Sequence, residues 1–388
     1  MNPSTTAASP GWIRRTLIGG LLVGISVLVA LLLLEGALRL FPSLLPEEAQ
    51  LRLSWDTEHF EQNTIDDPYL GFRYPPNRTI THRTHDFEIQ IQTDEHGFRN
   101  ASPWPAQAQT VVVGDSMAYG YGVPVEDSWS RRVGQSLAPG ALINLSLPGT
   151  GPEQSYRLLK TYGAPLHPQL VIYCIFPAND IPDSRRFREW LASGSPSLMR
   201  WGIEHVGPGS QGFPKNVLER SYLALGMRSV RKNLKSRFTS QTLHLPGGNM
   251  QLAPSLYETR MGEYSPSAPA FQSVVTAVRE TKALTDELGA QLLVVIFPTK
   301  EEVYLGARGA RFPDMVGPVK RALVPGGYDV LDLTEGLRKH AGTDVPPLYF
   351  EVDGHLNTRG NAVAAELILE KLQNDSSPEA MRTSLHEE

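Results

Sequence analysis

Five short apolar runs alternate with longer amphipathic segments along most of the chain. The runs cover residues 109–114, 141–145, 169–176, 291–297 and 328–332. Segments with helical length and spacing lie between and after them, at 126–138, 153–162, 267–288 and 357–373. Strands that alternate with helices favour right-handed crossovers and a parallel sheet. The pattern therefore predicts an α/β protein with a flavodoxin-like, doubly wound parallel sheet.

A different pattern occupies the N-terminal region. Residues 16–34 contain no charge and would span about 28 Å as a helix, close to the thickness of a bilayer's hydrocarbon core. The run is longer than the apolar region of a signal peptide, so we expect an uncleaved single-pass anchor over residues 16–36. Arg14 and Arg15 precede it. The positive-inside tendency then leaves residues 1–15 in the cytoplasm and the rest of the chain outside, in the periplasm.

Three further segments lie outside the alternating pattern. Residues 37–108 read as a stalk followed by a small β extension, because a period-2 stretch occupies 87–100. The main domain is expected over 109–373. Residues 183–265 interrupt it as a helical insertion, which is too long for a simple loop. The polar residues 374–388 are expected to be a disordered tail.

The insertion is rich in basic residues, which are Arg185, Arg186, Arg188, Arg220, Arg228, Arg231, Lys232, Lys235 and Arg237. On a tethered domain a basic helical segment suits contact with anionic lipid or an acidic polymer. A solvated helix face that covers the cleft explains the same charges, so both interpretations stay open.

Composition narrows the class of protein. The chain has 388 residues and a net charge of -5, which argues against a nucleic-acid partner. Its single cysteine, Cys174, has no partner for an internal disulfide and is expected to pack in the core. The glycine-rich phrase at 148–154 lacks the Gly-Lys-Ser/Thr of a phosphate loop. We expect no cofactor.

Candidate catalytic residues follow the predicted strands or precede the last predicted helix. Ser116 ends the first apolar run in VVVGDSMAYG, and Asp353 and His355 lie in DGHLN. Gly149 and Asn179 follow the second and third runs. A serine becomes a nucleophile when an imidazole takes its proton and a carboxylate orients that imidazole. Open α/β sheets place their sites at the carboxyl ends of the strands, where these residues are expected.

The order serine, glycine, asparagine, histidine resembles the four blocks of the SGNH/GDSL hydrolase superfamily. The segments DPYLGFRYPPNRT at 67–79 and FEIQIQTDEHGFRN at 87–100 resemble the region before the serine block in its membrane-anchored bacterial branch. The resemblance implies that Ser116, His355 and Asp353 form a catalytic triad. It also implies an oxyanion hole made by the backbone N–H groups of Ser116 and Gly149 and the side-chain amide of Asn179. The fold it implies is the doubly wound sheet already predicted.

The triad acid departs from the family's usual spacing. Most GDSL enzymes place the acid three residues before the histidine, where this chain has Val352. The nearest acids are Asp353 and Glu351. We favour Asp353, because anchored relatives with a D-x-H-x-N block look similar and because geometry rather than spacing defines a triad.

Each block also has an ordinary structural interpretation, as a turn or a helix cap. Other chemistries fit less well. An α/β-hydrolase elbow needs glycine where this chain has Ala118. The cluster of His82, His85 and Asp86 has the residue types of a zinc site but not a helical spacing, so we expect no metal.

Three functions remain open from sequence. The first is an extracytoplasmic esterase that removes acyl groups, plausibly acetyl, from a small ester, an acylated polysaccharide or another cell-envelope ester. The second is a polysaccharide O-acyltransferase that works with a multi-span acyltransferase partner, because Pro298, Lys300 and Tyr304 resemble a phrase of SGNH-like domains with that activity. The third is a tethered carbohydrate-binding or assembly protein without turnover.

Overall fold

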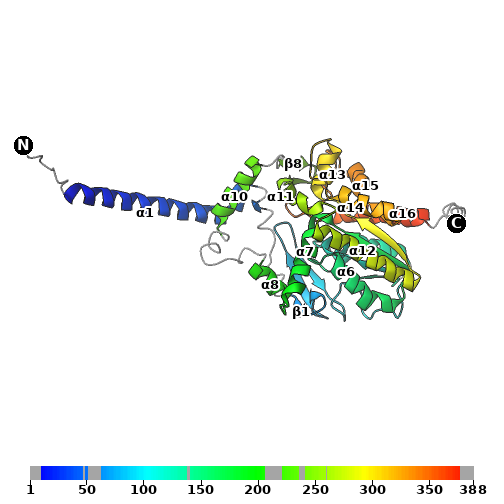
Figure 1. The fold of residues 1–388 in the computed structure, drawn as a ribbon. Coiled ribbons are helices and arrows are strands. Elements are labelled where there is room, and N and C mark those ends of the chain that lie inside the picture. The colour runs from blue at the N-terminus through cyan, green and yellow to red at the C-terminus, as the bar shows by residue number, and fades with distance from the viewer. Residues whose placement is uncertain are drawn as a thin grey trace, which may run out of the picture.

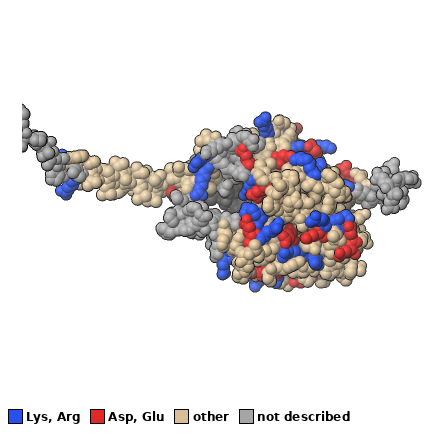
Figure 2. All heavy atoms as spheres, in the orientation of Figure 1, with Lys and Arg blue, Asp and Glu red and all other residues tan. Residues whose placement is uncertain are grey.

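A computed structural model describes residues 10–46, 49–50, 63–137, 140–205, 221–235, 241–258 and 260–375. Figure 1 shows one long helix, α1 (Pro10–Leu40), that projects from a globular part. Within α1, residues 14–40 are long and apolar enough to cross a membrane, and the most apolar window has no buried residues. Figure 2 shows this helix free of charged side chains between its two ends.

The core is a five-stranded parallel sheet in the spatial order β11-β10-β7-β5-β6. Its strands are β5 (Thr110–Val113), β6 (Leu142–Asn144), β7 (Leu170–Ile175), β10 (Gln291–Ile296) and β11 (Asp329–Asp332). Numbered along the chain, this is the order 2-1-3-4-5 of flavodoxin-like folds. The predicted fold class and all five predicted strands are therefore confirmed. The three central strands are buried nearly throughout, because helices cover both faces.

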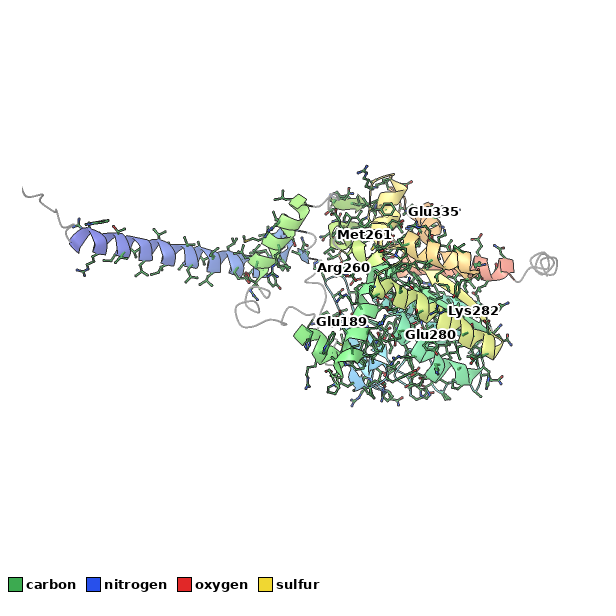
Figure 3. All side chains as sticks on the ribbon, viewed as in Figure 1. Glu189, Arg260, Met261, Glu280, Lys282 and Glu335 are labelled. Carbon is green, nitrogen blue, oxygen red and sulfur yellow. The ribbon has the colours of Figure 1, made fainter. Side chains whose placement is uncertain are left out.

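Two groups of helices cover the sheet. The first group consists of α6 (Pro152–Leu158), α7 (Pro177–Ser193) and α12 (Pro269–Leu288), which are labelled in Figure 1. Figure 3 labels Glu189 of α7 and Glu280 of α12. A second group packs together from α5 (Trp129–Ser136), α13 (Lys300–Ala307), α15 (Thr334–His340) and α16 (Thr358–Asp375). Helix α14 (Val316–Leu323) packs beside β11.

Two small antiparallel hairpins precede the sheet, and the period-2 stretch at 87–100 contains the last of their strands. They consist of β1 (Ile65–Asp67) with β2 (Gly71–Arg73), and of β3 (Thr79–Arg83) with β4 (Glu88–Gln92). Ile80 and Ile91 pair across the second hairpin and are buried in the main core. This extension is therefore part of the globular domain.

The interval 183–265 begins inside α7 and contains several separate elements. These are α8 (Leu198–His205), α10 (Tyr222–Lys235), β8 (Gln241–Leu245), β9 (Gly248–Leu252) and α11 (Ser255–Glu258). Several predicted segments lie outside the described residues, namely 1–9, most of the stalk at 51–62, parts of the insertion at 206–220 and 236–240, and the tail beyond Asp375.

Candidate active site

Ser116 is the first residue of α4 (Ser116–Tyr119), a single helical turn that follows β5. Asp115 caps this turn, since its Oδ1 accepts a hydrogen bond of 2.9 Å from the N–H of Met117. Gly114 must be glycine, because a Cβ there would lie 2.8 Å from the Cβ of Cys174 on β7. The tight turn places the Ser116 hydroxyl at the carboxyl edge of the sheet. The residue is buried there, with 2% of its surface exposed.

His355 and Asp353 reach this hydroxyl from a loop before α16. His355 Nε2 lies 2.7 Å from Ser116 Oγ, and His355 Nδ1 lies 2.5 Å from Asp353 Oδ1. The same carboxylate oxygen accepts a hydrogen bond of 2.8 Å from the backbone N–H of His355. All three side chains are buried. The structure thus brings the three predicted residues together, and it places Asp353 rather than the residue at the usual spacing, Val352, against the imidazole.

The electrostatics of this group suit proton transfer. Burial by itself would lower the pKa of His355, but the negative charge of Asp353 and its hydrogen bond outweigh burial and raise that pKa above its usual value of 6.5. Burial would raise the pKa of Asp353, but the His355 and Lys300 charges hold it below its usual value. The carboxylate is therefore ionised at neutral pH and stabilises a positive charge on the imidazole.

Asp115 is a second buried carboxyl group beside the serine. Burial raises its pKa to about 6. Its Oδ2 lies 3.4 Å from Ser116 Oγ, a longer contact than that to His355. With its other oxygen committed to the cap of α4, we assign Asp115 to shaping the turn.

A buried lysine holds the loop that carries the acid and the base. Lys300 Nζ donates hydrogen bonds to the backbone carbonyls of Glu351, Val352 and Asp353 at 2.9–3.2 Å. Burial lowers its pKa. Tyr304, one turn later in α13, accepts a hydrogen bond from Leu348 N–H on its hydroxyl.

Pro298, which precedes Lys300 and Tyr304 in the same sequence phrase, supports the same loop. The Pro298 carbonyl accepts a hydrogen bond of 2.9 Å from the Tyr349 hydroxyl. Proline, lysine and tyrosine in this phrase therefore all brace residues 348–353. This structural role accounts for them without an acyl-transfer partner.

The N-terminal extension also supports the acid. Asp86, in the turn between β3 and β4, accepts hydrogen bonds on Oδ2 from the N–H groups of Val352 at 3.0 Å and Asp353 at 2.6 Å. The sequence singled out this carboxylate only as a weak zinc candidate. His82, from the same candidate zinc cluster, is buried and packs against the ring of Tyr121, with ring centroids 4.8 Å apart. In the structure these residues therefore build the wall of the site.

We expect substitution of Asp86 to impair turnover through the position of Asp353. Asp86→Ala leaves two backbone N–H groups without their acceptor, so the loop should shift and kcat for p-nitrophenyl acetate should fall by up to about 100-fold. Asp86→Asn keeps a carbonyl oxygen and should retain most activity. Glu88→Ala, which removes an exposed ion pair with Arg83 in the same hairpin, is the control and should change nothing. Wild-type turnover in Asp86→Ala would contradict this role.

Gly149 and Asn179 follow the two strands that flank β5 in the sheet. Gly149 follows β6 and has a φ of +75°, which favours glycine. Asn179 lies in the first turn of α7, directly after β7, and is half-buried. No described residue accepts a hydrogen bond from the N–H of Ser116, the N–H of Gly149 or the side-chain amide of Asn179. Three donors at one edge of the sheet are thus without a protein acceptor in the described part of the chain.

Arg186 fixes the glycine loop, a role that the sequence did not reveal. Its Nη2 donates a hydrogen bond of 2.8 Å to the Gly149 carbonyl and lies 3.3 Å from Asp183 Oδ1. A Cβ at Gly151 would lie 3.1 Å from the backbone of Ser184, so the loop and α7 pack closely. Arg186 lies next to Arg185 and close to Arg188 in the sequence, and no sequence feature indicates which of the three arginines contacts the glycine loop.

Aromatic rings border the site on the side of the extension. The ring of Tyr121 lies 5.0 Å from that of His355, and Phe87 contacts both Tyr121 and Phe350, at 5.4 and 4.9 Å between centroids. Gly122 has a φ of +89°, and a Cβ there would clash with Phe87 and Phe350. These rings shield one side of the imidazole from water.

Comparisons with known proteins were made by sequence and by structure. No protein-family model matches the chain, and no curated protein is similar to it in sequence. Solved structures that match include a lipase/acylhydrolase from Enterococcus faecalis, with 15% identity over 70% of this chain and 98% of the other and a TM-score of 0.36.

Two further matches have the same TM-score of 0.36. TesA is 13% identical and an acetyl xylan esterase, AlAXEase, is 12% identical, and each match covers 68% of this chain and 98% of the other. Because these identities and TM-scores are low, a functional assignment rests on the geometry of this chain's own site.

Proposed function

We propose that this chain is a serine ester hydrolase of the SGNH type, tethered to the membrane by α1, with Ser116 as nucleophile. The observation that carries the proposal is the continuous hydrogen-bonded series from Ser116 Oγ through His355 to Asp353. A binding or assembly protein has no need of a buried hydroxyl, imidazole and carboxylate in this order. The proposal therefore favours turnover over the non-catalytic alternative.

In the proposed reaction, Ser116 Oγ attacks the ester carbonyl carbon while its proton passes to His355 Nε2. The bond from that carbon to the alcohol oxygen then breaks, and the imidazolium returns the proton to the departing alcohol. Water attacks the acyl-serine, gives its proton to His355, and releases the carboxylic acid as Ser116 regains its proton. Asp353 stabilises the imidazolium in both halves.

The oxyanion formed in each half-reaction needs donors. We assign this role to the N–H groups of Ser116 and Gly149 and to the side-chain amide of Asn179, the three groups without an acceptor among the described residues. Removing one such donor costs roughly 3 to 4 kcal/mol of transition-state stabilisation in a serine protease. Arg186 acts through Gly149 and is a positioning residue.

Three features of α1 support the proposed compartment. Its apolar length, its lack of burial and the arginines at its N-terminal end support a helix that stays in the membrane with the hydrolase domain outside the cytoplasm. A signal sequence near the N-terminus has similar features, but α1 continues as one helix to Leu40 and its end packs against α10. Loss of α1 would remove that packing.

The same acyl-serine would serve an O-acyltransferase, so the acceptor decides between two functions. The full-length chain in detergent micelles would be given acetylated polysaccharide, alone and mixed with unacetylated polysaccharide, and both acetate release and acetyl gain would be followed. We expect acetate release that the added acceptor does not suppress. Acetyl gain in place of release would overturn hydrolysis, and absence of both in folded protein would favour a binding role. Ser116→Ala is the control.

A further inference from the structure

Helix α10 exposes an apolar stripe beside a basic stripe. Met227, Val230 and Leu234 follow one face at spacings of three and four residues and are 65%, 48% and 83% exposed. Arg228 and Arg231 are also exposed, and 100° per residue places them next to that face. The opposite face packs inward, where Ser229 is buried and Leu225 is half-buried. Three large apolar side chains exposed in one row need a partner that removes them from water.

The start of α10 is attached where the charge-free part of α1 ends. Glu35 Oε2 accepts hydrogen bonds of 2.8 Å from Ser221 Oγ and of 2.9 Å from the N–H of Leu223. Glu35 Oε1 accepts a hydrogen bond of 3.1 Å from the N–H of Tyr222. The guanidinium of Arg39 lies 5.0 Å from the centre of the Tyr222 ring. Glu35 is the first charged residue after the apolar run 16–34, so α10 begins at the depth where the hydrocarbon core would end.

An apolar hollow of about 500 Å³ lies between the end of α1 and α10. Leu38 of α1 and Leu45 line one side, and α10 lines the other with Leu223, Met227 and Leu234. Gly226 permits the close approach, since a Cβ there would lie 3.0 Å from a methyl group of Leu45. Figure 1 shows α10 crossing the end of α1, and Figure 2 shows basic side chains at this junction. The apolar surface of the anchor thus continues onto α10.

We infer that α10 lies in the headgroup layer of the membrane that holds α1. Met227, Val230 and Leu234 would enter the boundary of the acyl chains, and Arg228 and Arg231 would contact the phosphates of anionic phospholipids. An acidic polymer would match the arginines but would leave the three apolar side chains in water. Lipid satisfies both stripes, and it is already present at the end of α1. The inference rests on the proposed retention of α1 in the membrane.

Membrane depth at single positions tests this inference. Full-length Met227→Cys and Leu234→Cys would each carry an NBD label in vesicles of phosphatidylcholine and phosphatidylglycerol that contain spin-labelled lipid. Cys174 is buried, with a pKa well above the usual value, and should stay unlabelled. We expect blue-shifted emission and quenching by the spin-labelled lipid at both positions. Val324→Cys, half exposed on the globular domain, should be unquenched.

Three further variants distinguish failure of the anchor from failure of the role of α10. A label at Leu28→Cys inside α1 reports the anchor itself, so an unquenched label there contradicts the retained anchor rather than the role of α10. Quenching at Leu28 with water-like emission at Met227 and Leu234 would overturn the inference. Arg228→Glu with Arg231→Glu should shift the Leu234 label toward water, while the matching pair of lysine substitutions should not. Insensitivity to the glutamates would exclude the anionic contact.

Discussion

Replacing Ser116 by alanine should abolish ester hydrolysis, with a fall in kcat of about 10⁶-fold for p-nitrophenyl acetate. The reason is that the Ser116 hydroxyl is the group that lies 2.7 Å from His355 Nε2 and can pass its proton to this base. Without the nucleophile, only the oxyanion donors and substrate binding remain to assist attack by water. The measurement is steady-state hydrolysis by the full-length chain in detergent.

A matched serine and a folding check make this result interpretable. Ser136→Ala, at the exposed end of α5, should keep the wild-type rate. Ser116→Ala should unfold at a temperature close to wild type, because the substitution removes one hydroxyl and leaves the turn capped by Asp115. Substantial hydrolysis by folded Ser116→Ala would show that the nucleophile lies elsewhere.

Replacing Asp353 by asparagine should lower kcat by about 10⁴-fold, the loss seen when the carboxylate of a serine protease triad becomes an amide. The amide cannot stabilise the imidazolium, and its NH2 group favours the wrong imidazole tautomer. Glu351→Gln is the matched control, since it neutralises the other acid near His355 in sequence. A larger loss in Glu351→Gln than in Asp353→Asn would contradict the assignment of the acid.

The same variant has a pH signature. His355 acts as a base only when neutral, so activity should fall as the pH drops through its raised pKa, with a midpoint above 6.5 in the wild type. In Asp353→Asn the raising effect of the carboxylate is lost and burial remains. The midpoint of the residual activity should therefore move to lower pH. A purely structural role of Asp353 would lower the rate without moving the midpoint.

The sheet was predictable because its strands are continuous apolar runs. A strand buried on both faces must be apolar at nearly every position, as in 169–176, so its sequence differs from that of any surface segment. The site residues were predictable for a related reason. Ser116 and Asn179 directly follow such runs, and the carboxyl ends of parallel strands meet at one edge. The choice of Asp353 over Glu351 rested on the D-x-H-x-N likeness, and the structure places Asp353 at the imidazole.

The supporting residues were not predictable from sequence. Asp86 reaches a loop 267 positions later, and local spacing carries no information about such a contact. Arg186 looked like an ordinary charge, although it fixes Gly149. Lys300 was noted only for its likeness to an acyltransferase-type phrase, although it binds three carbonyls of the catalytic loop. The insertion's first boundary, at 183, falls inside α7, because this helix continues through Pro182 to Ser193.

The most direct test of the account is to map where a fluorophosphonate attaches to the full-length chain. The reagent bonds to a serine oxygen only when a neighbouring base removes its proton, so it reports the Ser116–His355 pair rather than the fold. We predict a single adduct on the peptide that contains Ser116, formed faster as the pH rises through the His355 pKa and absent in His355→Ala. An adduct on another residue, or none in folded wild-type protein, would contradict the account.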